Sequence, residues 1–278
     1  MLNLCLAILS STLVTVLMRL GSGGDSARKP LLAVNYLTCT AVSAAFLRGG
    51  LAPHGSGAAF ALGLGLLGGA LYLGAFLLLQ RNVRESGVTL SSAFMKLGVI
   101  VPTALGVTLF RERLTAARTG GILLTLAAIA LLSGGSTQKK GSARLPALVL
   151  LMLCGGMADG LSKFYNAWGD PALEGHFLTF VFGFALLLCA GLCVREGQRP
   201  QGRDWLFGAL LGVPNYFSSR FLLRALGTVP ASVAYPVFSC GTILLTALVG
   251  RLAFGERPGR RQLAALAVVL VALVLLNG

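Results

Sequence analysis

Three cations and one carboxylate lie inside long apolar stretches of the sequence. They are Lys96 in "SSAFMKLGVIVP", Asp159 and Lys163 in "MADGLSKFYN", and Arg220 in "GVPNYFSSRFLLR". A charged side chain costs roughly 2.5–3.5 kcal/mol at the centre of a membrane-spanning helix, so it is expected to face the protein interior or a watery cavity. The excess of positive charge favours a cavity that binds an anionic or zwitterionic small molecule.

Lys96 shares a helical face with Ser92 and Thr89, because side chains three or four residues apart on a helix are neighbours. This stripe predicts one polar wall of a substrate cavity, with Lys96 and Ser92 as substrate-binding residues. Two structural roles remain open for Lys96. Its ammonium group either snorkels to the membrane surface or pairs with an acid on another span. Pro102 is expected to loosen the helix below the stripe.

Asp159 precedes Lys163 by four residues, which is the favourable helical order for an acid and a base. We expect these two side chains to neutralise each other. The alternative is that Lys163 binds substrate and that Asp159 couples transport to an ion. Arg220 shares a helical face with Tyr216 and Arg224, and it is either a substrate contact or a residue that snorkels to the membrane surface.

Further polar side chains within the apolar stretches extend the candidate site. Pro214 interrupts one of these stretches and can free a backbone carbonyl for hydrogen bonding. Together with Tyr216, the predicted substrate-binding set is completed by Asn35, Tyr36, Tyr72, Asn215, Tyr235 and Ser239.

The composition indicates which elements hold these residues. Hydrophobic residues make up 55% of the 278-residue chain and charged residues 12%, about half the charge of a soluble domain. The mean hydropathy is +0.81. A helix needs about 20 mostly apolar residues to cross a bilayer. The sequence therefore predicts an all-α integral membrane protein with ten transmembrane helices: Leu2–Leu20, Leu31–Arg48, Ala58–Gln80, Val88–Phe110, Thr115–Ser133, Leu145–Phe164, Leu173–Val194, Asp204–Arg224, Val229–Phe254 and Gln262–Asn277.

An internal repeat organises these spans. Gly87–Leu132 aligns without gaps on Ala231–Leu276, and a Glu-Arg pair coincides in the two copies. The chain is expected to contain two five-helix repeats, at residues 1–138 and 139–278. Because five is an odd number, the second repeat enters the membrane inverted. Inverted repeats are the architecture of many secondary transporters, with a substrate site near the membrane midplane.

The segments that close the two halves carry a family resemblance. They read "LFRERLTAARTGGILLTLAAIALL" and "AFGERPGRRQLAALAVVLVALVLL", and they resemble the EamA-like branch of the drug/metabolite transporter (DMT) superfamily. The segment "AYPVFSCG" is similar to the third span of small multidrug resistance transporters, whose substrate path is lined at the positions of Tyr235, Phe238 and Ser239. The resemblance implies a ten-helix protein that works by alternating access.

These observations predict a secondary transporter of a small anionic or zwitterionic metabolite. Two alternatives stay open: an exporter or flippase of a lipid-linked anion, and a membrane protein with no transport role. An enzyme is not expected, because the sequence contains no HExxH, Walker-loop or GxSxG motif. No cofactor or metal is predicted. The six cysteines fall within predicted spans and are expected to pack as small apolar residues.

The distribution of basic residues bears on partners and orientation. The net charge is +14, and most Lys and Arg residues lie in the connections after odd-numbered spans. This bias predicts that these connections are cytoplasmic and that both termini lie outside, whereas the family resemblance implies termini inside. The bias explains the basic charge without a nucleic-acid partner. The expected partners are the substrate and the lipid bilayer of a bacterial inner membrane.

Small residues and acidic residues near span ends are assigned structural roles. Glu112 and Glu256 precede the last span of each half, and each is expected to complement the dipole of the helix that follows it. Glycines spaced by four allow helices to approach closely. Contact inside one chain is expected, and a homodimer is the alternative. These glycine pairs are Gly65 with Gly69, Gly156 with Gly160, and Gly208 with Gly212.

Overall fold

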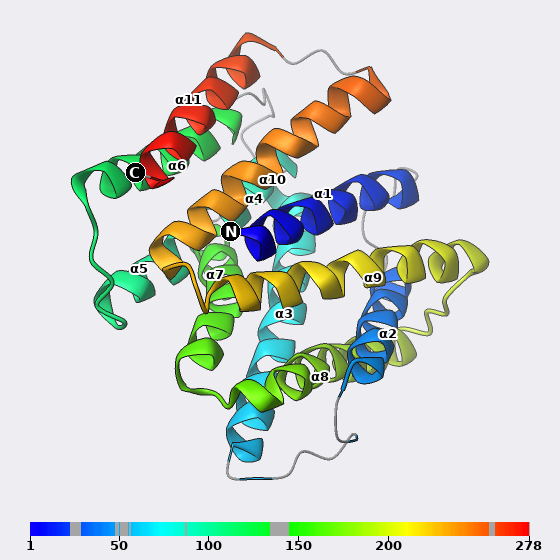
Figure 1. The fold of residues 1–278 in the computed structure, drawn as a ribbon. Coiled ribbons are helices and arrows are strands. Elements are labelled where there is room, and N and C mark those ends of the chain that lie inside the picture. The colour runs from blue at the N-terminus through cyan, green and yellow to red at the C-terminus, as the bar shows by residue number, and fades with distance from the viewer. Residues whose placement is uncertain are drawn as a thin grey trace. The chain divides into compact units, whose positions relative to one another are not determined.

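A computed structural model describes residues 1–22, 29–47, 50, 55, 57–86, 88–133, 145–255 and 259–277. Within these residues all regular secondary structure is helical (Figure 1). The elements are α1 (Leu2–Ser22), α2 (Lys29–Ala45), α3 (Ala58–Ser86), α4 (Val88–Leu97), α5 (Ile100–Thr108), α6 (Ala116–Ser133), α7 (Leu145–Trp168), the 3-10 helix η1 (Pro171–Leu173), α8 (Glu174–Arg195), α9 (Gly202–Ala225), α10 (Ala231–Phe254) and α11 (Arg260–Asn277).

Each predicted span coincides with a helix, which confirms the all-α prediction. The fourth predicted span is the exception in detail, because it is divided into α4 and α5 around Gly98 and Val99. Pro102 has no N–H to offer the carbonyl of Gly98. That carbonyl accepts instead from the amide of Val101, at 3.0 Å, and the chain turns there before α5 begins.

Several helices are long and apolar enough to cross a bilayer. Among the described residues they are the segments Ala58–Val83, Leu145–Trp168, Pro171–Arg195 and Ala231–Phe254. Shorter apolar helices occupy Leu2–Met18, Phe94–Thr108 and Ala116–Leu131. Together with the low content of charged residues, these helices identify the chain as an integral membrane protein.

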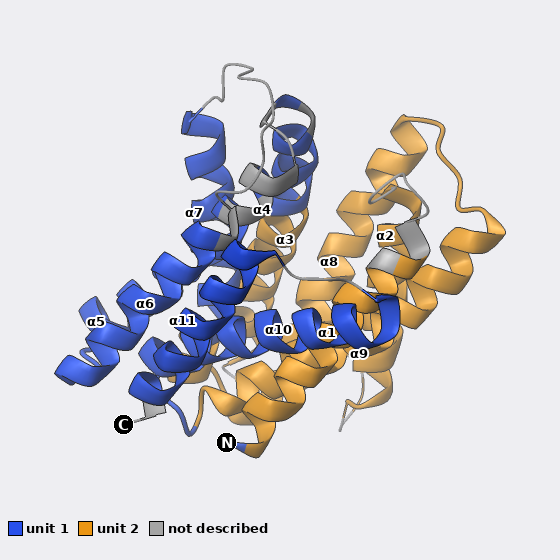
Figure 2. Cartoon of the chain, turned by 90° about the horizontal axis from the view of Figure 1, so that it is seen from above, with its two compact units in different colours: residues 1, 74–163, 228–278 blue, residues 2–73, 164–227 orange. Residues whose placement is uncertain are grey.

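The helices group into two compact units (Figure 2). Unit 1 comprises residue 1, residues 74–163 and residues 228–278, and unit 2 comprises residues 2–73 and 164–227. Each unit takes helices from both predicted repeats, residues 1–138 and 139–278. The predicted boundary between those repeats lies outside the described residues.

In unit 2, α2 lies against both α8 and α9, and α1 lies along α9. The glycine motifs account for the close contacts. A Cβ at Gly212 on α9 would come within 2.7 Å of the backbone carbonyl of Asn35 on α2. A Cβ at Gly69 on α3 would come within 2.6 Å of the backbone carbonyl of Val181 on α8. These glycines therefore bring helices of the same chain together, as predicted.

In unit 1, α6 lies against α11, and α10 contacts α5, α6 and α11. A Cβ at Gly121 on α6 would come within 2.8 Å of the side chain of Leu276 on α11. Gly98 approaches α7 in the same way, since a Cβ there would lie 2.9 Å from the carbonyl of Met152. Gly156 on α7 likewise lies close to the backbone of Gly98, in the turn between α4 and α5. The turn between α4 and α5 is thus a backbone-to-backbone contact with α7.

Candidate functional site

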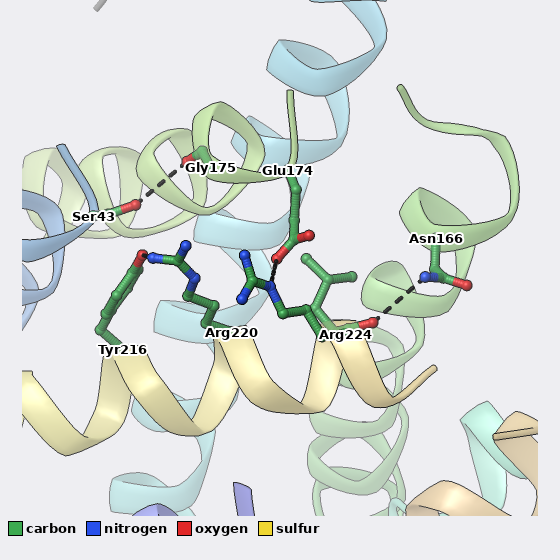
Figure 3. Close-up of polar contacts among 8 residues, drawn as sticks. Ser43, Asn166, Glu174, Gly175, Tyr216, Arg220 and Arg224 are labelled. Atoms are coloured by element: carbon green, nitrogen blue, oxygen red, sulfur yellow. Dashed lines mark hydrogen bonds and ion pairs between the residues drawn. The ribbon is translucent and has the colours of Figure 1, made fainter. Parts of the chain in front are cut away.

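One face of α9 carries three polar side chains at intervals of four residues, Tyr216, Arg220 and Arg224 (Figure 3). The two arginines point to different partners. Arg224 donates from Nε to Oε1 of Glu174, the first residue of α8, at 3.2 Å. Arg220 donates from Nη1 to the hydroxyl of Tyr216 at 2.6 Å. Arg224 is therefore neutralised by a carboxylate, whereas Arg220 forms no ion pair with any described residue.

Arg220 lies among aromatic rings. Its guanidinium carbon is 4.8 Å from the centroid of the Phe46 ring and 5.8 Å from that of Tyr216. Cations are attracted to ring faces at such distances. A guanidinium group has five N–H donors in a fixed planar fork. One of them is given to Tyr216, so donors remain that can hold a carboxylate or phosphate in the bidentate manner typical of arginine.

Ser43 on α2 is buried near these residues, and its hydroxyl group is hydrogen-bonded. The Ser43 hydroxyl lies 2.7 Å from that of Thr179 and 3.3 Å from the carbonyl of Gly175, both on α8. Tyr216 is 1% exposed, whereas Phe46 is 50% exposed. The Arg220 cluster, defined as Ser43, Phe46, Tyr216 and Arg220, thus has a rigid buried side and an open aromatic edge.

Other predicted site residues of unit 2 bridge helices. Asn215 on α9 donates its side-chain amide to Oδ1 of Asn35 on α2, at 3.3 Å. Tyr36 is buried beside Asn35. Tyr72 on α3 has its ring centroid 6.3 Å from that of Phe182 on α8. The structure brings Asn35 and Asn215 together, and the pair links the two helices.

In unit 1, Lys96 is exposed on the last turn of α4. Its ammonium group interacts electrostatically with the carboxylate of Asp159 on α7, although the two do not form a salt bridge within the described part of the chain. Of the predicted polar stripe, the side chains of Ser92 and Thr89 lie outside the described residues. Lys96 is thus a second cation within a predicted span that forms no salt bridge with any described residue.

The prediction that Asp159 and Lys163 form an ion pair is wrong. Lys163 instead lies 3.0 Å from Oε1 of Glu112, in the connection between α5 and α6, with side-chain exposures of 12% and 10%. Its ammonium group also lies 5.1 Å from the ring centroid of Phe110. The sequence separation favoured the neighbour one turn away, but the fold places the α5–α6 connection against α7.

Glu112 has a role that differs from the predicted one. Its Oε1 accepts from the amide of Ala231 and its Oε2 from the amide of Ser232, both at 2.8 Å. It therefore complements the N-terminal end of α10, whereas the sequence placed it at the helix that follows it, α6. The corresponding Glu256 of the second half lies outside the described residues.

The environment of Glu112 also fixes its protonation state. Burial raises the pKa of this carboxyl, but hydrogen bonds from Ser232, Ala231 and Lys163 together outweigh burial. The pKa of Glu112 consequently lies below its ordinary value, and the carboxylate is ionised at neutral pH. A charged group at this position strengthens its bonds to the free amides at a helix N-terminus.

Two more predicted residues lie on α10. Tyr235 is 2% exposed, and its hydroxyl donates to the backbone carbonyl of Asp159 on α7 at 2.6 Å. Ser239 is partly exposed one turn further along. The bond from Tyr235 joins α10 to α7 beside the Asp159 carboxylate.

Sequence reasoning missed Phe46 and Ser43. Phe46 follows the last residue of α2, and only the close contact of α2 with α9 brings it to Arg220. No spacing in the sequence links these positions. The available signal was compositional: an aromatic residue lies near the end of the second predicted span, where aromatic residues are often found at the membrane surface.

Comparison with known proteins relates the second half of the chain to a family. A model of the EamA-like transporter family matches residues 145–278, which include α7 to α11. The second half of the chain thus matches the EamA-like transporter family, which lies within the DMT superfamily. The match contains the second of the two closing segments and confirms the predicted resemblance there.

The chain is also similar to individual proteins over all or part of its length. An uncharacterised protein of Haemophilus influenzae is 25% identical over 276 residues, covering 92% of this chain and 90% of the relative. A probable 4-amino-4-deoxy-L-arabinose-phosphoundecaprenol flippase subunit, ArnE, of Photorhabdus laumondii is 28% identical over 103 residues, covering 34% of this chain and 88% of the relative. A solved crystal structure with 17% identity shares the fold, with a TM-score of 0.79 over 99% of this chain and 94% of that one.

Proposed function

We propose that the chain is a secondary transporter that moves a small anionic or zwitterionic metabolite across the cell membrane by alternating access. The observation that carries this proposal is the contrast between two arginines on α9. Arg224 is paired with Glu174, whereas Arg220, one turn away, forms no ion pair with any described residue. An unpaired charge within a membrane protein is costly, and a bound anion offsets that cost.

Lys96 also favours a substrate that carries a negative charge. It is exposed within a predicted span, and Asp159 interacts with it through charge without forming a salt bridge. A substrate anion can therefore approach Lys96 without first displacing an ion-pair partner. Lys163, in contrast, is occupied by Glu112 and is assigned a structural role. Asp159 remains the candidate for ion coupling, because a substrate that binds Lys96 changes the charge that the carboxylate experiences.

Alternating access rests on the proposed inverted repeats, and the glycine contacts support them. In the two repeats α3 corresponds to α9 and α2 corresponds to α8. Gly65 and Gly69 on α3 contact α8, while Gly208 and Gly212 on α9 contact α2. A twofold axis in the membrane plane that exchanges the two repeats would turn the contact of α3 with α8 into the contact of α9 with α2.

Uptake into liposomes tests the proposed function. Purified protein is reconstituted and offered radiolabelled amino acids, carboxylates, phosphorylated metabolites and matched cations. Saturable uptake of at least one anion or zwitterion is expected, and Arg220→Gln should lower its kcat/KM by about ten- to a hundredfold, since a charge-assisted hydrogen bond contributes about 1.5–3 kcal/mol. Arg195→Gln, at an exposed arginine that ends α8, is the matched control and should transport normally. Uptake restricted to cations, or uptake indifferent to Arg220→Gln, would contradict the proposal.

A second candidate function is the export or flipping of a lipid-linked anion. It is favoured by the similarity to ArnE, whose name describes a probable flippase subunit for a phosphoundecaprenol-linked sugar. Reconstituted protein can be given a fluorescent undecaprenyl phosphate lipid and a membrane-impermeant quencher. Protein-dependent movement of this lipid between leaflets, with no uptake of soluble anions, would select the flippase over the metabolite transporter.

A further inference from the structure

The side chains around Arg220 include an arrangement of aromatic rings that binding an anion alone does not require. The rings of Phe46 and Tyr216 are stacked, with centroids 6.1 Å apart and planes inclined by 14°. Phe217 meets both rings by its edge, at 5.8 Å and 5.2 Å between centroids. The guanidinium group therefore borders an ordered aromatic cluster.

Only part of this aromatic cluster is buried. Tyr216 is 1% exposed and its hydroxyl is held by Arg220, so it has no free surface for a ligand. Phe46 lies 4.8 Å from the guanidinium carbon and is 50% exposed. A ligand that reaches the unused donors of Arg220 therefore arrives next to an open ring.

We propose that Arg220 and Phe46 form a subsite for an aromatic carboxylate, in which Arg220 binds the carboxylate and Phe46 contacts the ring. This inference rests on the proposed function and narrows its substrate from anions in general to aromatic ones. Aromatic rings in proteins pair at centroid separations of about 4.5–7 Å. The guanidinium carbon lies 4.8 Å from the Phe46 centroid, so a ligand whose carboxylate is one or two bonds from its ring can bind Arg220 and bring that ring next to Phe46.

A different role for Phe46 makes a different prediction. If the ring only shields the guanidinium group from lipid, any apolar group of similar size beside the carboxylate will bind equally well. An aromatic subsite discriminates between flat and saturated rings, because edge-to-face and offset-stacked contacts depend on the ring quadrupole. The comparison of an aromatic acid with its saturated analogue therefore separates the two roles.

Calorimetric titration of the detergent-solubilised full chain provides the test, with phenylacetate, cyclohexylacetate, acetate and phenethylamine as probes. Phenylacetate is expected to bind about three- to tenfold more tightly than cyclohexylacetate, the preference that an aromatic pair supplies. Phenethylamine, a cation, should not bind. Phe46→Leu should abolish the preference for phenylacetate while keeping the binding of both acids.

The control is Phe60→Leu, which replaces another exposed aromatic residue of unit 2, one that stacks near Tyr165 rather than beside Arg220. It should retain the preference, and the melting temperature of every variant verifies folding. Equal binding of phenylacetate and cyclohexylacetate that still depends on Arg220 would overturn the aromatic subsite and leave the anion proposal standing. Binding of both acids that is unaffected by Arg220→Gln would overturn both.

Discussion

Glu112 binds the first turn of α10 with both carboxylate oxygens, Oε1 to the amide of Ala231 and Oε2 to the amide of Ser232, each at 2.8 Å. Lys163 on α7 shares Oε1 at 3.0 Å. One side chain thus ties the α5–α6 connection to two helices. Gly106 lies so close to Glu112 that a Cβ there would come within 2.7 Å of Oε2, so the carboxylate is also confined sterically.

Glu112→Gln is expected to lower the free energy of unfolding by about 2–4 kcal/mol. The amide keeps one acceptor but turns an N–H₂ group towards a backbone amide, and Lys163 loses its buried counter-charge. The melting temperature in detergent measures the loss. The matched control is Glu85→Gln, whose carboxylate forms an exposed pair with Arg81 one turn away and should shift stability by less than about 0.5 kcal/mol. Equal melting temperatures for the two variants would contradict this assignment.

The stabilisation by Glu112 is expected to depend on pH in one direction. Its pKa in the folded protein lies below the ordinary value of 4.5, so its contribution is complete above that value and is lost as the pH falls through the folded pKa. The difference in melting temperature between the wild type and Glu112→Gln should stay constant from pH 8 to about pH 5.5 and shrink at more acidic pH. A difference that grows on acidification would show that the sign is wrong.

Lys96→Gln is expected to weaken substrate binding by about ten- to a hundredfold with little change in melting temperature, because a charge-assisted contact is worth about 1.5–3 kcal/mol. Lys96→Arg should recover part of the affinity, since the guanidinium fork replaces the charge but not the geometry. Binding and melting are measured on the same preparation. Early melting combined with normal binding would show that Lys96 holds the helices together through Asp159 and has no part in the site.

The distribution of basic residues predicts that both termini lie on the outer face. A cysteine added after Gly278, in a Cys5→Ser background that removes the exposed native thiol, should react with an impermeant maleimide in intact cells. Labelling that requires broken membranes would place the terminus inside, the orientation implied by the family resemblance.

The helices could be predicted from the sequence because each span is a local property. Continuous apolar length decides whether a segment crosses a membrane, and Leu145–Phe164 was found within one turn of the observed end of α7. The division between α4 and α5 was not predicted. Pro102 was recognised as a weak point, but the turn forms at Gly98, where the contact with α7 requires a residue without a side chain.

The site was only partly predictable, since its pairings are tertiary. Lys163 had an acid one turn away in Asp159, yet it pairs with Glu112 from a distant connection. Arg220 and Arg224 looked alike in the sequence, and only the position of Glu174 at the start of α8 distinguishes the paired arginine from the unpaired one. Spacing along one helix identifies which side chains share a face, but it does not identify what that face meets.

The glycine contacts also limit how unit 2 can move. At Gly69 and Gly212 the backbone of one helix touches the backbone of the next, with no layer of side chains between them. Sliding between packed helices usually proceeds by small rotamer changes in such a layer. Without it, α9 and α2 are expected to travel together, as are α3 and α8, so each pair behaves as one rigid body. Conformational change in this unit is then expected away from these two backbone contacts, for example where α2 meets α8 through side chains such as Ser43 and Thr179.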